Sequence, residues 1–352
     1  MGRAVRPWRL VPVLLALLCV CRSARADADA PTWPGLSTLS ATDGGSRVLL
    51  RRSGAPTLAV CARAQAMPQL SDSATATLLR RAGQQAIRRS RDGWEVCLRL
   101  PAQELTTALW ALQTATLRPA EATGHDERSA LSALLAPGTP AARPPTLAVV
   151  GDFDVDAAAR ILRELRWPAP TPPSKPTSPQ AQTWTPPSGL QLVGWKAPAR
   201  GTAPRAAMEV AATLLARNLS EHHGRSVRAD SGTHLVFLRI HSKDSSDALR
   251  RALLKELAQL QRIPPRQLAA AVVLTESALL QELDDNAGVA RSLLDGVDAQ
   301  GQPRSVLRHL SLVSGLSGAA VSSAVGFLAL ENSAWLPAPG PAGREAHGAK
   351  QP

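Results

Sequence analysis

Three aspartates alternate along one short segment of the sequence, with the spacing that opens a calcium-binding loop. They are Asp152, Asp154 and Asp156, and they follow a short apolar run. A calcium loop of the helix–loop–helix kind also needs a glycine at its sixth position and a glutamate at its twelfth. Those positions hold Ala157 and Arg163, so the calcium interpretation fails. We predict instead that the aspartates form a turn and that Asp154 caps the following helix by accepting a backbone hydrogen bond.

Histidine and serine offer the next candidates for chemistry. His222 and His223 are adjacent in the sequence. Adjacent residues of a regular element point in different directions, so we predict that these two rings cannot chelate one ion well and lie in a surface loop. No G-x-S-x-G nucleophile motif occurs, and no serine is paired with a histidine and an acid at a readable spacing.

Two cysteines lie beyond the N-terminal segment, and each belongs to an apolar alternating run. If the runs around Cys61 and Cys97 are neighbouring strands in an oxidising compartment, the two residues can form one disulfide. Two small, buried hydrophobic side chains fit the same pattern equally well. Two cysteines cannot by themselves build a thiolate zinc site.

Residues 1–26 have the features of an export signal. Arg3, Arg6 and Arg9 give it a positive start, and residues 10–20 form an apolar core too short to span a bilayer as a helix. Ala-Arg-Ala at its end offers a small-x-small cleavage site. We therefore predict an exported protein, periplasmic or secreted, with no stable membrane span once the signal is removed.

The charge of the chain does not indicate a nucleic-acid partner. The formal net charge is +12, and the predicted signal accounts for five arginines and no acid, which leaves +7. Only five of the 40 basic residues are lysines, a bias typical of codon usage rather than of a binding device. Nucleic-acid surfaces interleave basic and aromatic residues, but this chain has three Phe and no Tyr.

Two proline-rich runs divide the chain. Residues 168–187 cannot form a helix or a central strand and are predicted to be an interdomain linker, and residues 337–352 a disordered tail. Residues 31–167 and 188–336 each combine strands and helices in a similar order, which suggests a duplication. The predicted fold class is therefore α+β, with two homologous domains that are each a mostly antiparallel sheet backed by helices.

Hydrophobic periodicity predicts the elements themselves. Strands are expected at residues 46–52, 56–64, 94–100, 146–150, 190–195 and 233–241, the first two as a pair joined at Gly54. Helices are expected at residues 73–89, 101–117, 155–165, 203–218, 245–262, 264–294 and 317–330.

Five segments, in this order, resemble the pitrilysin/insulinase-type zinc metallopeptidases. They begin LSATDGGSRVLLRRSGAPTLAV, GWEVCLRLPAQELTTALWAL, LAVVGDFDVDAAARIL, TAPRAAMEVAATLLARNLS and FLRIHSKDSSDALRRALLKEL. The resemblance covers most of residues 36–336, and it rests on order and spacing rather than on any single piece. It implies a duplicated peptidase fold, of which residues 31–167 are a shortened first domain.

The resemblance also implies a zinc site, which the sequence does not supply. Active members bind zinc through an inverted H-x-x-E-H helix and a further glutamate. No H-x-x-E-H occurs in this chain, and the expected region, residues 64–84, holds no His and no Glu. Where the further glutamate is expected, the chain has Ala130, Ala133 and Leu134. We predict no catalytic residue, no metal ligand and no cofactor.

Active members also contact substrate through an arginine and a tyrosine in the second domain. Arg225 or Arg228 stands where the resemblance places the arginine, whereas the chain contains no tyrosine. The resemblance thus transfers at most one substrate-binding arginine.

These observations lead to a non-catalytic relative of the zinc peptidases. Such a chain is expected to pair with an active zinc metallopeptidase subunit and to help enclose or bind extended peptides. The alternative is a stand-alone exported binding or structural module without a link to peptidases. An active peptidase would require zinc ligands that the sequence lacks.

Overall fold

A computed structural model describes ten stretches of the chain. These are residues 33–40, 45–64, 67–69, 87–90, 93–114, 116–118, 127–135, 145–165, 186–300 and 305–337. All of them belong to one compact unit. The predicted signal, most of the predicted linker and nearly all of the predicted tail lie outside the described residues. So does most of the predicted helix 73–89, whose last residues belong instead to the strand β5 (Ile87–Ser90).

Six strands form the first sheet. Their order is β1 (Leu36–Ser40), β2 (Ser46–Arg51), β8 (Thr146–Gly151), β3 (Thr57–Ala64), β6 (Gly93–Pro101) and β5. Neighbouring strands are antiparallel except β2 and β8, which run parallel. The predicted pair at residues 46–52 and 56–64 does form two strands, but β8 lies between them, so they are not hydrogen-bonded to each other. The strands β4 (Met67–Gln69) and β7 (Thr116–Arg118) make a separate short pair.

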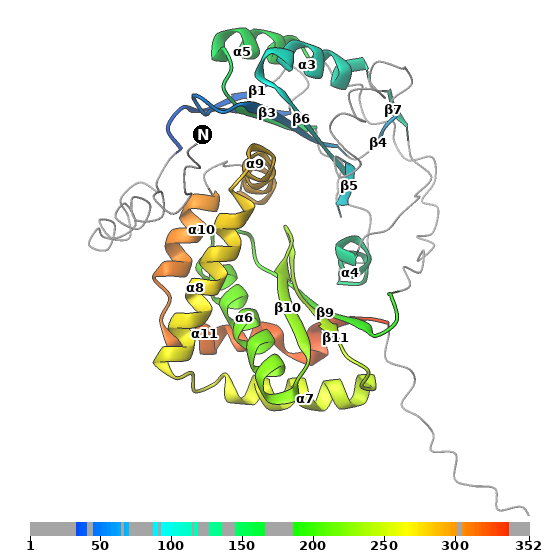
Figure 1. The fold of residues 1–352 in the computed structure, drawn as a ribbon, viewed down its shortest axis with the longest axis vertical. Coiled ribbons are helices and arrows are strands. Elements are labelled where there is room, and N and C mark those ends of the chain that lie inside the picture. Colours follow the sequence, from blue (N-terminus) through cyan, green and yellow to red (C-terminus); the bar gives the residue numbers. More distant parts are fainter. Residues whose placement is uncertain are drawn as a thin grey trace, which may run out of the picture. The chain divides into compact units, whose positions relative to one another are not determined.

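Helices cover both faces of the first sheet, as Figure 1 shows. Leu49 and Leu98 pack on one side with the helices α3 (Leu105–Thr114) and α5 (Val155–Glu164). Val48, one residue along the strand, faces the other side and packs in the cluster that contains α9 (Asn286–Gln300). The alternation of apolar residues in β2 therefore serves two buried faces rather than one buried and one exposed face.

The helix α5 begins as its sequence predicts. The Asp154 carboxylate accepts hydrogen bonds from the backbone N–H groups of Asp156 at 2.9 Å and Ala157 at 3.0 Å. The predicted capping role is therefore confirmed. The side chains that α5 buries are Ala158, Ala159 and Leu162.

Four antiparallel strands form the second sheet. Their order is β10 (Ser226–Ser231), β11 (Leu235–His241), β9 (Leu190–Lys196) and β12 (Ser333–Leu336). The helix α6 (Ala203–His223) packs on one face through Met208 and Leu215, both fully buried. Gly224, with φ of 59°, ends α6 and starts the turn into β10, a strand that the sequence pattern did not reveal.

The opposite face of the second sheet is covered by a helix from the first half of the chain, α4 (Glu127–Leu135). Leu131 of α4 packs there with Leu192 and Phe237. A Cβ atom at Gly194 would lie 3.2 Å from Leu131, so the missing side chain allows α4 to approach the sheet closely. Because α9 of the second half packs on the first sheet, the two halves exchange one helix in each direction.

The remaining helices belong to the second half. They are α7 (Ser246–Gln259), α8 (Pro265–Glu282), α10 (Ser305–Ser314) and α11 (Gly318–Ala324), with a 3₁₀ turn η5 (Val325–Leu328) after α11. The predicted single helix at residues 264–294 is two helices, α8 and α9. The chain does not continue as one helix through Asp285. The Asp285 carboxylate accepts a hydrogen bond from the Gly288 N–H at 2.6 Å, in the first turn of α9, and so caps the start of that second helix.

The predicted fold class, α+β with antiparallel sheets backed by helices, is confirmed. Within the described residues, no helix on its own combines the length and the apolar composition that crossing a bilayer requires. Val306–Ser314 and Gly318–Leu328 reach that composition only as a pair, and the pair is bent by 116°.

Candidate functional site

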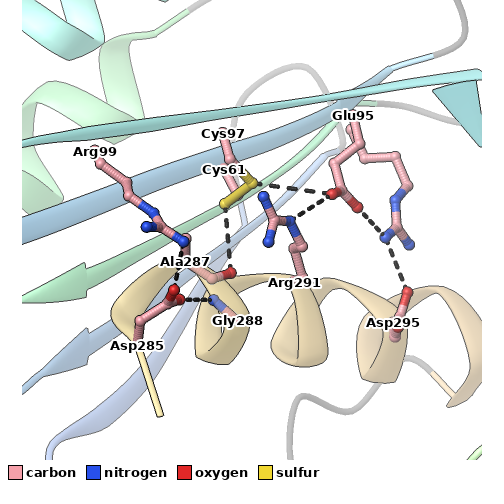
Figure 2. The surroundings of a disulfide bond; sticks show 10 residues. Cys61, Glu95, Cys97, Arg99, Asp285, Ala287, Gly288, Arg291 and Asp295 are labelled. Carbon is pink, nitrogen blue, oxygen red and sulfur yellow. Dashed lines mark hydrogen bonds and ion pairs between the residues drawn. A yellow bond between two sulfur atoms is a disulfide. The ribbon is translucent and has the colours of Figure 1, made fainter. Parts of the chain in front are cut away.

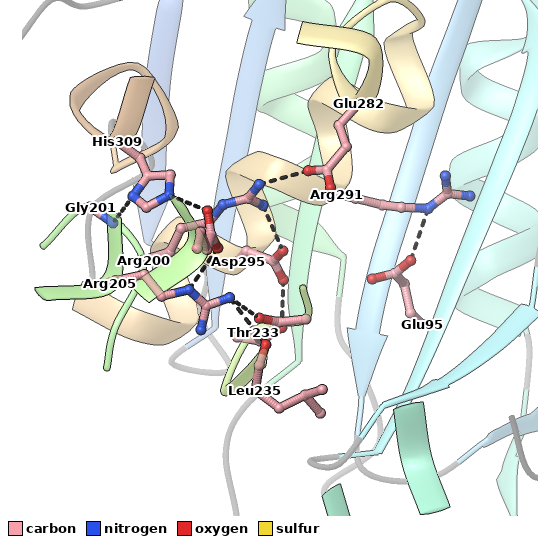
Figure 3. Close-up of polar contacts among 12 residues, drawn as sticks. Glu95, Arg200, Gly201, Arg205, Thr233, Leu235, Glu282, Arg291, Asp295 and His309 are labelled. Carbon is pink, nitrogen blue, oxygen red and sulfur yellow. Dashed lines mark hydrogen bonds and ion pairs between the residues drawn. The ribbon is translucent and has the colours of Figure 1, made fainter. Parts of the chain in front are cut away.

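The charged side chains that gather between α9, the first sheet and the loops of the second sheet form the candidate site. We call this group the ionic seam and define it as Arg63, Glu95, Arg200, Glu282, Arg291 and Asp295. Figure 3 labels all of them except Arg63. Four elements contribute to it: β3, β6, the end of α8 and α9, together with the loop that follows β9. A buried charge is costly unless an opposite charge compensates it, so the pairing within the seam determines what it can do.

A disulfide lies between the first sheet and α9, beside the seam, as Figure 2 shows. Cys61 of β3 and Cys97 of β6 are directly opposite each other in the sheet, and their sulfur atoms are 2.10 Å apart. The Ala287 carbonyl oxygen of α9 lies 3.9 Å from the Cys61 sulfur. Both cysteines are almost completely buried, so α9 shields the bond from solvent.

Glu95 is the centre of the first half of the seam. Its carboxylate accepts a hydrogen bond from Arg63 at 2.7 Å and from Arg291 of α9 at 3.0 Å. Glu95 and Arg63 each leave 8% of their side chain exposed. Two arginines thus compensate one buried carboxylate, and one of them comes from a helix nearly 200 residues further along the chain.

Asp295 continues the seam toward the second sheet. It accepts hydrogen bonds from Arg63 at 2.9 Å and from the Thr233 hydroxyl at 2.8 Å, and it lies 3.5 Å from Arg200. Burial by itself would raise the pKa of Asp295, but the Arg63 and Arg200 charges outweigh it and hold the pKa below its ordinary value. Arg200 in turn donates to Glu282 at 2.7 Å.

A second buried cluster adjoins the seam at the start of α6. Glu209 accepts hydrogen bonds from Arg205 at 2.7 Å and pairs with the His309 ring of α10 at 2.7 Å. The other nitrogen of His309 accepts a hydrogen bond from the Gly201 N–H at 3.2 Å. Burial raises the pKa of Glu209, but the Arg205 charge and the hydrogen bond from His309 more than reverse that effect, so its pKa is strongly lowered.

The arrangement favours a structural role for these charges. A general base near neutral pH needs a pKa close to the operating pH. The lowered pKa values of Glu209 and Asp295 keep both groups ionised and engaged with arginines. The seam therefore positions α9, α6 and the first sheet and supplies no activated acid, base or nucleophile.

The region in which a zinc site would be expected is only partly described. Residues 70–86 lie outside the described residues, so the predicted loss of the H-x-x-E-H helix rests on the sequence. On α4, Ala130 is half-buried and Leu134 is 51% exposed. Within the part of the chain that the structure describes, no group of three His, Cys, Asp or Glu side chains is placed to hold a metal ion.

The two arginines named as substrate-binding candidates lie near one edge of the second sheet. Arg225 donates to Asp244 at 2.7 Å, and a hydrogen bond from Ser242 and this arginine together lower the pKa of Asp244. Arg228 is 74% exposed, and its Nε atom is 3.6 Å from the nearest carboxylate oxygen of Asp230. Arg225 is thus occupied within the fold, and Arg228 is the arginine free to meet a ligand.

The prediction of a surface loop at the adjacent histidines is wrong. His222 and His223 lie in the last turn of α6 rather than in a surface loop, and both rings contact one carboxylate. His222 Nδ1 and His223 Nε2 each lie 3.1 Å from an oxygen of Glu256, which is fully buried on α7. Adjacent side chains of a helix are about 100° apart, but they converge here because the acceptor lies between them.

The sequence contained a signal for the seam that the prediction missed. Glu95, Cys97 and Arg99 alternate in one strand, so their side chains share one face of the sheet. A strand face that carries two charges beside a buried cysteine requires a partner with complementary charges. Asp285, directly before α9, and Arg291, within α9, provide the complementary charges for Arg99 and Glu95.

Comparison of the whole chain with known proteins identifies the fold. Neither a protein-family model nor a curated protein sequence matches this chain. Solved structures of M16 peptidases do match it in three dimensions. An M16-like peptidase from Alicyclobacillus acidocaldarius matches with a TM-score of 0.57 at 13% identity, over 87% of this chain and 99% of that one. The M16 inactive domain from Pseudomonas fluorescens matches with a TM-score of 0.56 at 14% identity, over 86% and 97%.

A longer protein matches over part of its length. The periplasmic protease PqqL from Escherichia coli has a TM-score of 0.51 at 14% identity, over 95% of this chain but 48% of that protein. The fold of this chain is therefore that of the M16-type peptidases, the fold that the resemblance to pitrilysin and insulinase predicts. This fold occurs both in peptidases and in an inactive domain.

Proposed function

We propose that this chain is a non-catalytic member of the pitrilysin/insulinase-type zinc peptidases that pairs with an active peptidase subunit. The observation that carries the proposal is a peptidase fold whose sequence has no H-x-x-E-H motif and no tyrosine. Without two histidines one helical turn apart, the family's zinc and its activated water have no ligands. A complete fold without these ligands supports a use of the scaffold itself.

The length of a similar protein supports the pairing. This chain matches 48% of PqqL, so about half of that protein lies outside the matched part. In the present case we infer that a separate, active subunit complements this chain. The role of this chain is then to complete an enclosure and to help hold extended peptides, with Arg228 and, less directly, Arg225 as candidate contacts.

The predicted organisation is part of the same proposal. Residues 1–26 are removed on export, residues 31–167 and 188–336 are two homologous peptidase-like domains, and residues 168–187 link them. The periplasmic location of PqqL is compatible with the export that the N-terminal segment predicts.

Co-purification from cells that export both proteins tests the pairing. The tagged full chain is expected to retain a second protein that carries H-x-x-E-H, in a 1:1 complex by size-exclusion chromatography with light scattering. The mixture is expected to cleave peptides with the metal of the partner, and the chain alone is expected to cleave none. A charge-neutral variant, Arg228→Gln, is expected to raise KM for peptides while kcat changes little, because an exposed arginine can contribute to substrate binding without touching the reacting atoms.

Two results would contradict the proposal. Stoichiometric zinc in the purified chain would show that it has a metal site of its own. A monomer that retains no peptidase in cells that produce one would favour the alternative, a stand-alone exported binding or structural module. In that case Arg228→Gln would leave the kinetics of any co-exported peptidase unchanged.

A further inference from the structure

The outer side of α7 and the turns at its two ends carry an unusual accumulation of positive charge. The exposed cations of this segment are Lys243, Arg250, Arg251, Lys255, Arg262 and Arg266. The helix lies at the lower edge of the view in Figure 1 and turns its apolar side, including Leu249 and Leu253, toward α6 and the core. We call the outward side, defined by these six cations, the basic surface.

The negative charges of the same segment do not neutralise the basic surface. Glu256 is fully buried between two histidines, and Asp244 is bound by Arg225. Asp247 is the exposed acid that remains in this stretch. None of the six cations has an ion-pair partner among the residues that the structure describes.

The arrangement of charge along α7 includes one repulsive pair, although Asp247 also lies four residues before Arg251. Arg251 and Lys255 are four residues apart, and like charges at this spacing repel each other by a few tenths of a kcal/mol. The neighbouring helix α6 does the opposite: Arg217 pairs with Glu221 at 2.6 Å, also four residues apart. An external anion would relieve the repulsion on α7.

An apolar side chain lies within the basic surface. Leu254 is 51% exposed, one turn beyond Arg250 and one residue before Lys255. An exposed leucine one turn from Arg250 and Arg251 suits a boundary at which phosphate headgroups meet acyl chains. We propose that the basic surface docks the exported protein on a membrane face rich in anionic phospholipids, with the arginines binding the headgroup phosphates.

The geometry favours a lipid surface over a small anion. The cations are distributed along a helix of 14 residues and its flanking turns rather than converging on one point. Guanidinium groups bind phosphate oxygens in a bidentate manner, and four of the six cations of the basic surface are arginines. Each basic residue at an anionic membrane contributes about 1 kcal/mol, which is about fivefold in affinity.

Co-sedimentation with vesicles tests the proposal on the full mature chain. Binding is expected to vesicles of phosphatidylglycerol mixed with phosphatidylcholine, to disappear at high ionic strength, and to be absent with phosphatidylcholine alone. Arg250→Gln combined with Arg251→Gln is expected to weaken binding about 25-fold. The matched control, Arg160→Gln with Arg163→Gln, removes the same charge from the exposed side of α5 and is expected to leave binding within about twofold.

Four outcomes would overturn the proposal. They are equal binding to neutral vesicles, no binding to anionic vesicles at low ionic strength, equal loss in the α5 control, and displacement by inorganic phosphate at constant ionic strength. The last would assign the surface to a soluble anion. A fifth outcome would also overturn the proposal: the protein does not bind vesicles, and the α7 variant no longer binds an acidic protein that the unmodified chain binds. The surface would then be a protein-docking site. Circular dichroism and the melting temperature establish that each variant is folded.

Discussion

At the scale of single residues, the protein buries carboxylates that remain ionised. Glu209 contacts Arg205 and His309, and none of these three side chains is more than 5% exposed. Removing one partner of such a group leaves an uncompensated charge, which costs about 3–5 kcal/mol. The charges therefore make the local packing intolerant of substitution, although they do not by themselves make the protein more stable than an apolar core would.

This burial predicts how stability depends on pH. The pKa of Glu209 and the pKa of Asp295 are both lowered in the folded protein. A lowered pKa contributes stability that is complete above the unfolded value, about 4, and that is lost as pH falls toward the folded value. The free energy of unfolding, measured by urea denaturation, is expected to fall progressively as the pH is lowered from about 5 to 3.

The variant Glu209→Gln tests whether Glu209 causes this dependence of stability on pH. It is expected to lower the free energy of unfolding by about 3 kcal/mol at neutral pH and to flatten the curve below about pH 5. The control is Glu164→Gln, a change of the same kind at an exposed site on α5, which is expected to shift stability by less than about 0.5 kcal/mol. If the free energy of unfolding of Glu209→Gln fell equally steeply below about pH 5, Glu209 would not control the loss of stability in acid.

At the scale of elements, α9 carries two kinds of contact with the first sheet. Ala290 and Leu294 pack in the same apolar cluster as the inner residues of β2 and β8, and Arg291 and Asp295, one residue further, enter the ionic seam. Both kinds of contact lie on one face of the helix because residues four apart recur after one turn. The ion pairs fix the rotation and register that apolar packing alone leaves loosely defined.

A comparison of two strand residues separates the buried and exposed contacts of α9. Glu95→Gln removes a carboxylate that two arginines share, and it is expected to cost about 3 kcal/mol and to increase hydrogen exchange in α9. Arg99→Gln breaks an exposed pair with Asp285 and is expected to cost about 1 kcal/mol or less. Equal losses in the two variants would mean that the seam does not hold α9 in place.

The elements show what the sequence could and could not predict. Hydrophobic patterning identified six of the twelve strands in the described residues, and Asp154 identified a helix start, because these signals are local. The position of β8 between β2 and β3 is set by contacts about 100 residues apart, which no local pattern contains. The apolar spacing of α9 predicts one buried face, but it cannot say which sheet that face covers.

The candidate site was harder to predict for the same reason. Glu95 and Arg63 were readable as charges inside apolar strands, yet their partners Arg291 and Asp295 reach them only after the two halves of the chain meet. For His222 and His223, adjacency in the sequence argued against joint binding of one ion and for a surface loop. That argument omitted the position of Glu256, on a different helix.

At the scale of the whole molecule, the exchange of α4 and α9 makes the two halves depend on each other. The first sheet has two apolar faces, and residues of its own half, in α3 and α5, cover one of them. The other face, which includes Val48 and Val150, is fully buried in a cluster to which α9 contributes. A first half without α9 would expose that face and leave Glu95 and Arg63 without their partners from α9.

The predicted domains should therefore be homologous but unable to fold separately. Residues 31–167 expressed alone are expected to aggregate or to lack a cooperative unfolding transition, because a large buried apolar face becomes exposed to water. Co-expression with residues 188–336 is expected to give a 1:1 complex that unfolds cooperatively, since α9 and α4 can then reach the sheets they cover. Differential scanning calorimetry and size-exclusion chromatography distinguish these cases. A cooperative transition in residues 31–167 alone would show that α3 and α5 suffice to stabilise the first sheet and that the exchange is dispensable.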